Sequence, residues 1–463
     1  MRSIEKYFEV MQKKRIAFIG YGVTNSDVIR LFCKKGIDVT LLDQKSSDQL
    51  GDVYEEFQSL GVSFQLGNGY LDHLTDFDVV FRSPGMYYYH ERLQAARAAG
   101  VVITSEMEAF FSLCPCKIYA VTGSDGKTTT TTLISEFLSH AGFRVHKGGN
   151  IGRALLPIIE DIQENDVAVV ELSSFQLLSM RQSPDVAVIT NIAPNHLDVH
   201  GTMEEYIYAK TNLIAHQDAF SKTVLNQDNA ETIKLSTMVR GMLTTFSRKD
   251  QPTYGAFLRA DGMVCYSNNG DITPIVHKDE IRIPGMHNVE NYLAAITAVW
   301  GNVSIDVIGD VAKNFGGVEH RIEFVRELDG VKWYNDSIAT SPTRVLAGLH
   351  AFSQKLIVIM GGYDKKIPFE PMADAICQQV KLVLLMGVTA NKIEAAIRGS
   401  DFYQEGVPEL VHVFSMEEAV QEARKRAVTG DIVTLSPVCA SFDLYPNFEA
   451  RGVHYKNLVK KLS

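Results

Sequence analysis

The sequence predicts an α/β protein of three domains, because one pattern begins three times along the chain. Each time, a short run rich in β-branched residues precedes a glycine-rich turn and then a helical stretch, as expected where a parallel strand feeds a helix. These segments are residues 15–24, 117–128 and 355–364. The chain has 463 residues, whereas a single hydrophobic core stops growing at roughly 250–300 residues.

Signals between these segments predict the domain limits. Residues 105–111 are helix-forming, which places a first boundary near residue 107. Residues 219–283 are rich in Asp, Asn, Gly and Thr with short strand-like runs, which indicates a β-rich insertion that ends before a helix at 288–300. We expect a Rossmann-like N-terminal domain (1–107), a P-loop ATPase-like central domain with this insertion (108–317), and a Rossmann-like C-terminal domain (318–463).

Composition excludes several classes of protein. Hydrophobic residues make up 46% and charged residues 22%, which is ordinary globular usage. The formal charge of −10 disfavours attraction to nucleic acid or to an anionic membrane surface. No apolar stretch approaches the roughly 18–20 residues of a membrane span, and the N-terminus lacks the apolar core of a signal peptide. We expect a cytoplasmic protein with reduced cysteines, since the Cys114-Pro-Cys116 pair lacks further ligands for zinc.

The strongest local motif is Thr122-Gly-Ser-Asp-Gly-Lys-Thr128, between an apolar strand and a helix-forming run. Backbone N–H groups at a glycine-rich helix start bind phosphate oxygens, a lysine neutralises phosphate charge, and a following hydroxyl binds Mg²⁺. We therefore predict a nucleotide-phosphate site at Lys127 and Thr128. The spacing is shorter than in the general P-loop, because Val121 occupies the position of its first glycine. A tight turn with an exposed lysine remains the alternative.

A second glycine-rich turn begins at Gly20. Gly20 and Gly22 match the first two glycines of a dinucleotide fingerprint, but Asn25 occupies the position of the third. Asp43 ends the next strand, where a carboxylate can meet a ribose hydroxyl. A nucleotide site and a plain strand–turn–helix unit both remain open. A nicotinamide-dependent oxidoreductase would rest on this turn alone and would leave Lys127 unexplained.

Polar residues follow apolar runs further along the chain. Glu171 ends one predicted strand, and His196 follows another. The carboxyl ends of parallel strands form the edge where such sheets bind ligands, so both are metal or substrate candidates. Taken singly, such a residue is more often a polar group whose hydrogen bonds are satisfied at the strand end. The same choice, between ligand contacts and solvated turns, applies to the clusters at 319–323, 334–340 and 435–443.

In this order, the segments resemble those of the Mur ligases, the ATP-dependent amide-bond-forming enzymes of peptidoglycan precursor synthesis. The resemblance spans nearly the whole chain. The shared motifs are Thr-Gly-Ser-Asp-Gly-Lys-Thr (122–128), Asn150-Ile-Gly, Glu171-Leu-Ser-Ser, Asn195-His196-Leu-Asp, Gly285-Met-His-Asn288 with Asn291, Glu319-His-Arg321 and Asn335-Asp336-Ser. Within the family, residues 171–177 and 435–452 are similar to the members that add D-glutamate.

The resemblance implies a reaction and its requirements. The terminal carboxylate of UDP-N-acetylmuramoyl-L-alanine would be activated by ATP as an acyl phosphate. The amine of D-glutamate would then displace phosphate through a tetrahedral intermediate, leaving ADP and phosphate. The implied role is in cell-wall synthesis, on which cell shape and cell division depend. Mg²⁺ or Mn²⁺ would occupy two sites, and the C-terminal domain would close to exclude water. We expect a monomer.

The family motifs assign roles at the matching positions. The ATP set comprises Gly123, Ser124, Asp125, Gly126, Lys127, Thr128, Thr129, Asn288, Arg321 and Asp336. The metal set comprises Thr128, Glu171, His196 and Lys210, and the catalytic set comprises Lys127, His196 and Lys210. The UDP-sugar set comprises Gly22, Val23, Thr24, Asp43, Ser83, Gly85 and Asn150. The D-glutamate set comprises Thr340, Lys366, Ser441 and Phe448.

Lys210 matches the family lysine that CO₂ converts to a carbamate, a change from cation to anion that explains a lysine among cation ligands. From the residues alone, we would expect an exposed helix lysine. The chain departs from the family at Ile338, where lysine is common, and at Ser341, where asparagine is usual. Lys365 and Lys366 are adjacent, so either could contact D-glutamate. An ATP-binding switch, another Mur ligase and a folylpolyglutamate synthase remain alternatives.

Overall fold

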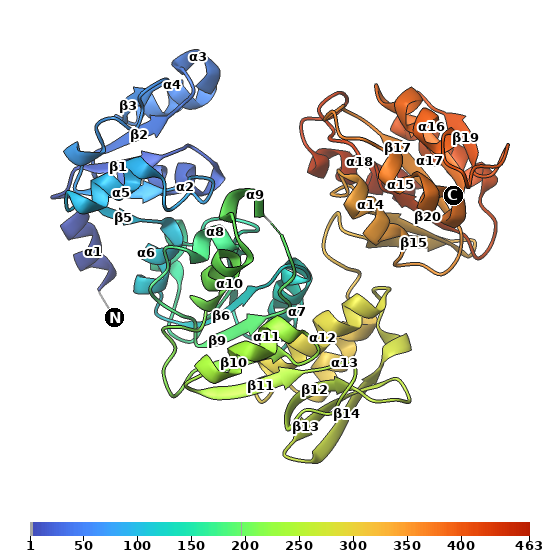
Figure 1. Ribbon diagram of the computed structural model, residues 1–463, viewed down its shortest axis with the longest axis horizontal. Helices are drawn as coiled ribbons and strands as arrows, with labels where there is room; N and C mark the ends of the chain where they lie inside the picture. Colours follow the sequence, from blue (N-terminus) through green and yellow to red (C-terminus); the bar gives the residue numbers. More distant parts are fainter. Residues whose placement is uncertain (1–2, 196) are drawn as a thin grey trace. The chain divides into compact units, whose positions relative to one another are not determined.

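The computed structural model describes residues 3–195 and 197–463. It divides into two compact units, which we describe separately (Figure 1). The first comprises residues up to 278 together with 290–311, and it contains the predicted N-terminal domain and most of the predicted central domain. The second comprises residues 279–289 and 312–463, and it contains the predicted C-terminal domain.

The N-terminal domain is built on a parallel sheet of five strands in the order β3-β2-β1-β4-β5. Its strands are β1 (Ile16–Ile19), β2 (Val39–Asp43), β3 (Ser63–Leu66), β4 (Val79–Arg82) and β5 (Val102–Thr104). Its helices are α1 (Ile4–Met11), α2 (Val23–Lys34), α3 (Ser47–Leu50), α4 (Asp52–Ser59), η1 (Leu74–Asp76), α5 (Glu91–Ala98) and α6 (Glu106–Leu113). The predicted Rossmann-like arrangement is confirmed.

The central domain carries a parallel sheet of six strands in the order β11-β10-β9-β6-β8-β7. The strands are β6 (Lys117–Thr122), β7 (Val145–Gly149), β8 (Val167–Glu171), β9 (Val186–Ile189), β10 (Lys222–Asn226) and β11 (Met242–Phe246). The helices are α7 (Lys127–His140), η2 (Leu156–Asp161), α8 (Ser174–Leu177), α9 (Leu197–His200), α10 (Met203–Thr211), α11 (Ala230–Lys234), η3 (Leu235–Met238) and η4 (Lys278–Glu280).

The β-rich stretch predicted for residues 219–283 has two parts. Strands β10 and β11 belong to the parallel sheet. Only β12 (Tyr254–Leu258), β13 (Met263–Asn268) and β14 (Asp271–His277) form a separate antiparallel sheet. The predicted helix at 288–300 is α12 (Met286–Val299), and α13 (Ile305–Asn314) follows it. The insertion is therefore smaller than the composition suggested.

The C-terminal domain has a sheet of six strands in the order β15-β16-β20-β17-β18-β19, in which only the β15–β16 pair is antiparallel. The strands are β15 (Glu323–Leu328), β16 (Val331–Asn335), β17 (Leu356–Gly361), β18 (Val380–Met386), β19 (Glu409–His412) and β20 (Ile432–Leu435). The helices are α14 (Pro342–Leu349), α15 (Glu370–Gln379), α16 (Ala390–Arg398), α17 (Met416–Arg426) and α18 (Phe448–Lys461).

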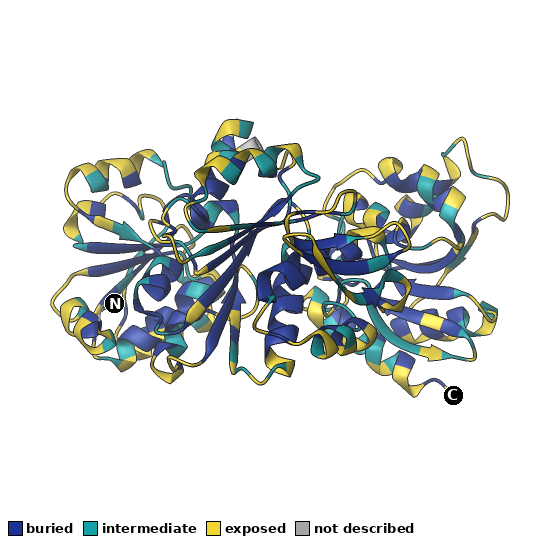
Figure 2. Cartoon of the chain, turned by 90° about the horizontal axis from the view of Figure 1, so that it is seen from below, coloured by how far each residue is buried: buried dark blue, intermediate teal, exposed yellow. Residues whose placement is uncertain are grey.

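Strand burial explains why the apolar runs predicted parallel sheets. Along β17, Leu356, Val358 and Met360 pack into one hydrophobic cluster, while Ile357 and Ile359 pack into another. Because successive side chains point to opposite faces, both faces of this sheet are covered. Figure 2 shows the same pattern elsewhere, with buried strands and helices that are exposed on their outer faces.

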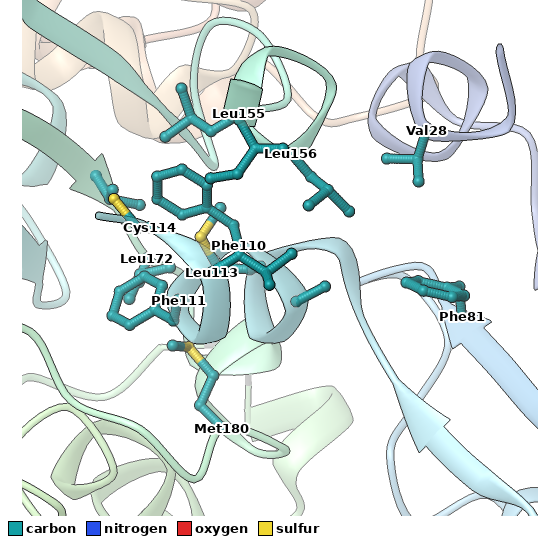
Figure 3. Close-up of a cluster of buried hydrophobic side chains, with 14 of the residues drawn as sticks. Val28, Phe81, Phe110, Phe111, Leu113, Cys114, Leu155, Leu156, Leu172 and Met180 are labelled. Atoms are coloured by element: carbon teal, nitrogen blue, oxygen red, sulfur yellow. The ribbon is translucent and has the colours of Figure 1, made fainter. Parts of the chain in front are cut away.

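One hydrophobic cluster joins the N-terminal and central domains. Helix α6 contributes Phe110 and Leu113, which belong to the same cluster as Phe81 of β4 and Leu155 and Leu172 of the central domain. Figure 3 shows these side chains around α6. Glu106 of this helix also accepts hydrogen bonds from the backbone N–H groups of residues 155 and 156, at 2.9 and 2.8 Å. The two domains therefore form one packed body.

Candidate active site

The predicted phosphate loop lies at the carboxyl edge of the central sheet. Strand β6 leads into it, and its neighbours β8 and β9 end beside it, with Val121 opposite Glu171 and Thr122 opposite Ile189. The loop occupies residues 123–126, and α7 begins directly after it at Lys127. Strand, loop and helix thus follow one another as the sequence predicts.

Two loop positions require glycine. Gly123 has φ +152° and Gly126 has φ +78°, both in the region that L side chains rarely adopt. A Cβ atom at Gly123 would overlap the hydroxyl of Thr190, and one at Gly126 would overlap the side-chain oxygen of Asn291. The backbone of the loop therefore passes close to Thr190 and Asn291 at these two positions.

Residues of the turn that follows β9 hold the phosphate loop through hydrogen bonds. Asp125 donates its backbone N–H to the side-chain oxygen of Asn191 at 2.9 Å, and its carbonyl accepts from the Thr190 hydroxyl at 2.6 Å. Ser124 donates its hydroxyl to the carbonyl of Ala193 at 2.9 Å. A loop fixed from behind in this way keeps its geometry before a ligand arrives, which favours tight anion binding.

Lys127 is the first residue of α7, so its charge lies at the positive end of the helix dipole. Its ammonium group donates to the carbonyls of Gly123 and Ser124, at 3.1 and 2.9 Å. Thr128 follows and is partly exposed. A cation and the first N–H groups of a helix together form an anion site of the kind that holds phosphate.

Lys210 of α10 is buried beneath this loop, with only 1% of its surface exposed. Its ammonium group donates to the carbonyl of Gly123 at 2.7 Å and lies 4.6 Å from the centre of the Tyr206 ring. Lys127 donates to the same carbonyl, so two cations lie close together. Burial, reinforced by the charge of Lys127, lowers the pKa of Lys210 well below its usual value. The expectation from the residues alone, an exposed helix lysine, is wrong.

Glu171 is also buried, at the end of β8. One carboxylate oxygen, Oε1, accepts from the side-chain amide of Asn150 at 2.8 Å. The other, Oε2, is buried and has no hydrogen-bond partner among the described residues. A buried carboxylate oxygen without a donor is costly unless a cation or a donor reaches it. This hydrogen bond places Asn150, of the predicted UDP-sugar set, in contact with Glu171, of the predicted metal set.

Residues 3–195 and 197–463 contain no group of three His, Cys, Asp or Glu side chains that could hold a metal ion. His196 and the side chain of Val23 lie outside the described part of the chain. The donors present, a carboxylate oxygen of Glu171 and the hydroxyl of Thr128, are oxygen ligands of the type that Mg²⁺ prefers.

The glycine-rich turn of the N-terminal domain is held by its own polar residues. Asp43 accepts the backbone N–H of Tyr21 at 3.3 Å and that of Lys45 at 2.9 Å. Asn25 donates its side-chain amide to the carbonyls of Ile19 and Gly20, at 2.9 and 3.0 Å. Asn25 therefore stabilises the turn through its side chain at the position where the fingerprint has a glycine.

Ser83 faces the same turn from the neighbouring strand. A Cβ atom at Gly20 would lie 3.3 Å from its hydroxyl oxygen. The predicted UDP-sugar residues Gly22, Asp43, Ser83 and Gly85 thus belong to the carboxyl edge of one parallel sheet or to the turns that follow it, and Thr24 lies in the first turn of α2. That edge is where open α/β sheets bind ligands.

In the second unit, Asp336 is buried below the end of β16. Its carboxylate accepts the backbone N–H of Ile322 at 3.2 Å and the hydroxyl of Ser436 at 3.3 Å. Burial raises its pKa to about 7. Arg321, also in the predicted ATP set, donates its backbone N–H to Val318 at 2.9 Å, and the Asn288 amide donates to Pro284 at 2.6 Å.

Three of the four predicted D-glutamate residues, Thr340, Ser441 and Phe448, come from two segments that the structure brings together. Arg451 of α18 is buried and donates to the backbone oxygen of Ser337 at 3.0 Å, to that of Cys439 at 3.1 Å and to that of Ala440 at 3.2 Å. The Ser337 hydroxyl in turn donates to the carbonyl of Phe448 at 2.8 Å. The guanidinium therefore ties the loop leading to Thr340 to the turn containing Ser441. Burial lowers its pKa to about 10.

Of the two adjacent lysines, Lys365 reaches Thr340. Its ammonium group donates to the hydroxyl and to the carbonyl of Thr340, both at 3.0 Å. Lys366 has φ +60° and lines a cavity of about 760 Å³ between the loop that precedes α15 and helix α16. The predicted D-glutamate set contains Lys366, but it is Lys365 that contacts Thr340 of the same set.

Three residues were missed by sequence reasoning. Tyr206 lies beside Lys210, and its hydroxyl is 3.0 Å from that of Ser124. Asn291 fills the space behind Gly126, and Arg451 joins the loops of the C-terminal domain. Arg451 lies within the glutamate-type segment 435–452, and Asn291 lies within the motif after Gly285. Both residues therefore belong to a family motif, but the motif assigned them no role. The only sequence signal for Tyr206 is its i, i+4 spacing from Lys210.

Comparison with known proteins identifies the class that this fold and site define. Three domain families match in order: "Mur ligase MurD-like, N-terminal domain" over residues 14–105, "Mur ligase middle domain" over 121–299 and "Mur ligase, glutamate ligase domain" over 320–439. The chain belongs to the Mur ligase family. It is 47% identical to the UDP-N-acetylmuramoylalanine–D-glutamate ligase of Clostridium acetobutylicum, covering 100% of this chain and 99% of that protein. It is 46% identical to the enzyme of the same name from Clostridium perfringens, covering all of both.

Solved structures share the fold. A UDP-N-acetylmuramate-alanine ligase from Thermotoga maritima has a TM-score of 0.57 and 18% identity, covering 97% of this chain and 98% of that one. A MurF ligase from the same organism, solved in complex with ADP, has a TM-score of 0.56 and 17% identity, covering 97% and 98%. These likenesses establish the three-domain α/β architecture.

In the described part of this chain, no helix has the length and apolar character needed to cross a bilayer.

Proposed function

We propose that this protein is an ATP-dependent ligase that joins D-glutamate to UDP-N-acetylmuramoyl-L-alanine in peptidoglycan precursor synthesis. The observation that carries the proposal is the 47% identity, over the whole chain, to a ligase named for D-glutamate. The phosphate loop with Lys127, and the buried Lys210 and Glu171 beside it, support the ATP-dependent chemistry.

The first step activates a carboxylate. The terminal carboxylate oxygen of UDP-N-acetylmuramoyl-L-alanine attacks the γ-phosphorus of ATP, the bond to the β,γ-bridging oxygen breaks, and ADP leaves. Both reactants are anions, so positive charge must lie between them. Lys127 and the N–H groups at the start of α7 supply that charge in our proposal. We propose that Asn150, which donates to Glu171 at 2.8 Å, orients the substrate.

The second step forms the amide. The neutral amine of D-glutamate attacks the carbonyl carbon of the acyl phosphate to give a tetrahedral intermediate, which collapses with loss of phosphate. The attacking nitrogen loses one proton, which the departing phosphate or solvent water accepts. Lys365 with Thr340, and the turn containing Ser441 beside Phe448, are proposed to bind the two carboxylates of D-glutamate. Asn288, Arg321 and Asp336 remain predicted ATP contacts.

Mg²⁺ would supply positive charge at the phosphates. Its ligands would be Glu171, Thr128 and a carbamate on Lys210, all of which offer oxygen atoms. The fit rests on the unpartnered Oε2 atom of Glu171, because a buried carboxylate oxygen of this kind suits a divalent cation. Two Mg²⁺ sites, or Mn²⁺ in their place, and a ligand role for His196 remain predictions.

Lys210 is suited to carbamylation. Only a neutral amine adds to CO₂, forming the N–C bond of a carbamate and releasing a proton. The lowered pKa of Lys210 favours that neutral form. The resulting anion would relieve the repulsion with Lys127, and it would add an oxygen donor near Glu171. We further propose that the protein acts in the cytoplasm as a monomer, without binding nucleic acid.

A substrate panel tests the proposal. Phosphate release is measured from ATP and Mg²⁺ with UDP-N-acetylmuramoyl-L-alanine and, in turn, D-Glu, L-Glu, L-Ala, L-Lys and meso-diaminopimelate. We expect turnover with D-Glu alone. Turnover with a different amino acid would retain the ligase chemistry but change its acceptor, and no turnover with any of them would favour an ATP-binding switch.

The geometry at Thr340 predicts which lysine binds D-glutamate. Lys365→Ala should raise the KM for D-glutamate by roughly tenfold or more, because a charge-assisted hydrogen bond to a carboxylate is lost. Lys366→Ala should raise it less than threefold. Initial rates at saturating ATP and UDP-sugar measure both effects. The reverse order would return the role to Lys366.

A further inference from the structure

Arg82 joins the N-terminal domain to the central domain. It is the last residue of β4 and directly precedes the predicted UDP-sugar loop, yet its side chain is buried, with 1% exposed. One guanidinium nitrogen, Nη1, donates to the carbonyl of Met86 at 2.8 Å. The other, Nη2, donates to the carbonyl of Phe175 at 3.0 Å and to the hydroxyl of Ser179 at 3.1 Å. One side chain therefore holds the loop and the segment of α8 together.

The charge of Arg82 is balanced through a hydroxyl. Ser179 accepts from Arg82 and donates to the carboxylate of Glu108 at 2.8 Å. Burial lowers the pKa of Arg82 and raises that of Glu108. The attraction between the two charges opposes both shifts, so each charge partly offsets the cost of burying the other. The Nε atom of Arg82 is buried without a hydrogen-bond partner among the described residues. An apolar side chain would fill this place at lower cost, which points to a positioning role.

Tyr87 makes a second connection from the same loop. Its hydroxyl donates to the carboxylate of Glu205 at 2.8 Å, and burial raises its pKa to about 12, so it stays protonated. Glu205 lies 3.4 Å from Nδ1 of His200, whose Nε2 atom is 2.9 Å from the hydroxyl of Ser174. Ser174 begins α8, shortly after Glu171, and Glu205 lies on the helix that carries Lys210.

We propose that Arg82 and Tyr87 are positioning residues that lock the loop of residues 83–90 onto the two central-domain segments carrying Glu171 and Lys210. The loop would then present the carboxylate of the bound UDP-sugar at a fixed place relative to the phosphate loop. This inference rests on the proposed function for its effect on catalysis. Its structural content, the coupling of the loop to α8 and α10, does not depend on it.

Three variants test the lock. Tyr87→Phe removes one hydroxyl without changing the shape of the side chain, and Arg82→Met removes the guanidinium. Arg97→Met is the matched control, because Arg97 binds the same loop without contacting the described residues of the central domain. It donates to the carbonyl of Tyr88 at 3.0 Å and lies 4.2 Å from the centre of the Tyr88 ring. The measurements are kcat, the Kd of UDP-N-acetylmuramoyl-L-alanine, and amide hydrogen exchange of residues 173–180 in the ligand-free protein.

We expect kcat to fall by about tenfold in Tyr87→Phe and by about a hundredfold in Arg82→Met, because small displacements of reacting groups are costly. The Kd of the UDP-sugar should change less than threefold in Tyr87→Phe. Exchange at residues 173–180 should accelerate in both variants and stay at the wild-type rate in Arg97→Met.

The outcomes separate the two proposals. A kcat within twofold of wild type in Tyr87→Phe, with unchanged exchange at residues 173–180, would overturn the lock even if the wild type is an active D-glutamate ligase. Accelerated exchange in a protein whose wild type does not turn over would support the lock and reject the proposed function. If Arg82→Met does not fold, Ser179→Ala replaces it, since it removes the central-domain hydroxyl that Arg82 contacts.

Discussion

Replacing Lys127 by alanine is expected to lower D-glutamate-dependent phosphate release by roughly 10²–10³-fold, the usual cost of removing a preorganised charge from a reacting group. The ammonium group lies at the start of α7, where it donates to two carbonyls of the phosphate loop. No other side chain of the loop carries a positive charge. The measurement is kcat/KM for ATP at saturating UDP-sugar and D-glutamate.

Lys147→Ala is the matched control for this prediction. Lys147 lies on β7 of the same sheet and is exposed, so its loss removes a lysine without touching the loop. The activity of the Lys147→Ala variant should stay within twofold of wild type. Thermal unfolding of both variants shows whether the fold is intact. Activity of a folded Lys127→Ala variant within tenfold of wild type would contradict the phosphate assignment.

Replacing Lys210 by alanine should leave less than about 1% of the activity, with partial recovery in the presence of a small carboxylate such as acetate or formate. The physical reason is that the carbamate is proposed to act as an oxygen donor and as a counter-charge to Lys127. Alanine leaves space in which a carboxylate can take that place. Activity is measured with increasing concentrations of acetate, at constant ionic strength.

Lys222→Ala provides a control at a second lysine of the central domain whose pKa is lowered. Lys222 is half-buried, and burial lowers its pKa to about 8, but its ammonium group donates to the carbonyl of Thr297 of α12 at 2.5 Å. Any activity lost in that variant through instability should not return with acetate. Failure of acetate to restore a folded Lys210→Ala variant would count against the carbamate, and so would equal restoration by an unrelated salt.

Local patterns predicted much of the fold. The apolar runs before Gly20, Gly123 and Gly361 are strands β1, β6 and β17, because each is short, β-branched and followed by a turn that requires glycine. The motif at residues 122–128 predicted the phosphate loop for the same local reason. The extent of the β-rich insertion was predicted less well, since a buried parallel strand such as β10 and an antiparallel hairpin have similar composition.

Long-range contacts decided what local patterns could not. A helix lysine at position 210 is exposed by ordinary expectation, and only the packing of α10 under the loop makes it buried and lowers its pKa. Likewise, the order of Lys365 and Lys366 in the sequence does not show which of them contacts Thr340. That depends on the backbone conformation of Lys366, with φ +60°, and on the packing of its loop against the loop of Thr340. The structure also revealed the contact of Arg82 with α8.

By itself, the sequence determined the class of this protein, its three α/β domains and the residue types of its phosphate loop, because strands, glycine turns and helix starts depend on neighbouring residues. Only the tertiary structure decided which charges share a site and which are buried. The strengths of ionic interactions and the positions of pKa values depend on distance and solvent exposure, and both follow from the way segments far apart in the chain pack together.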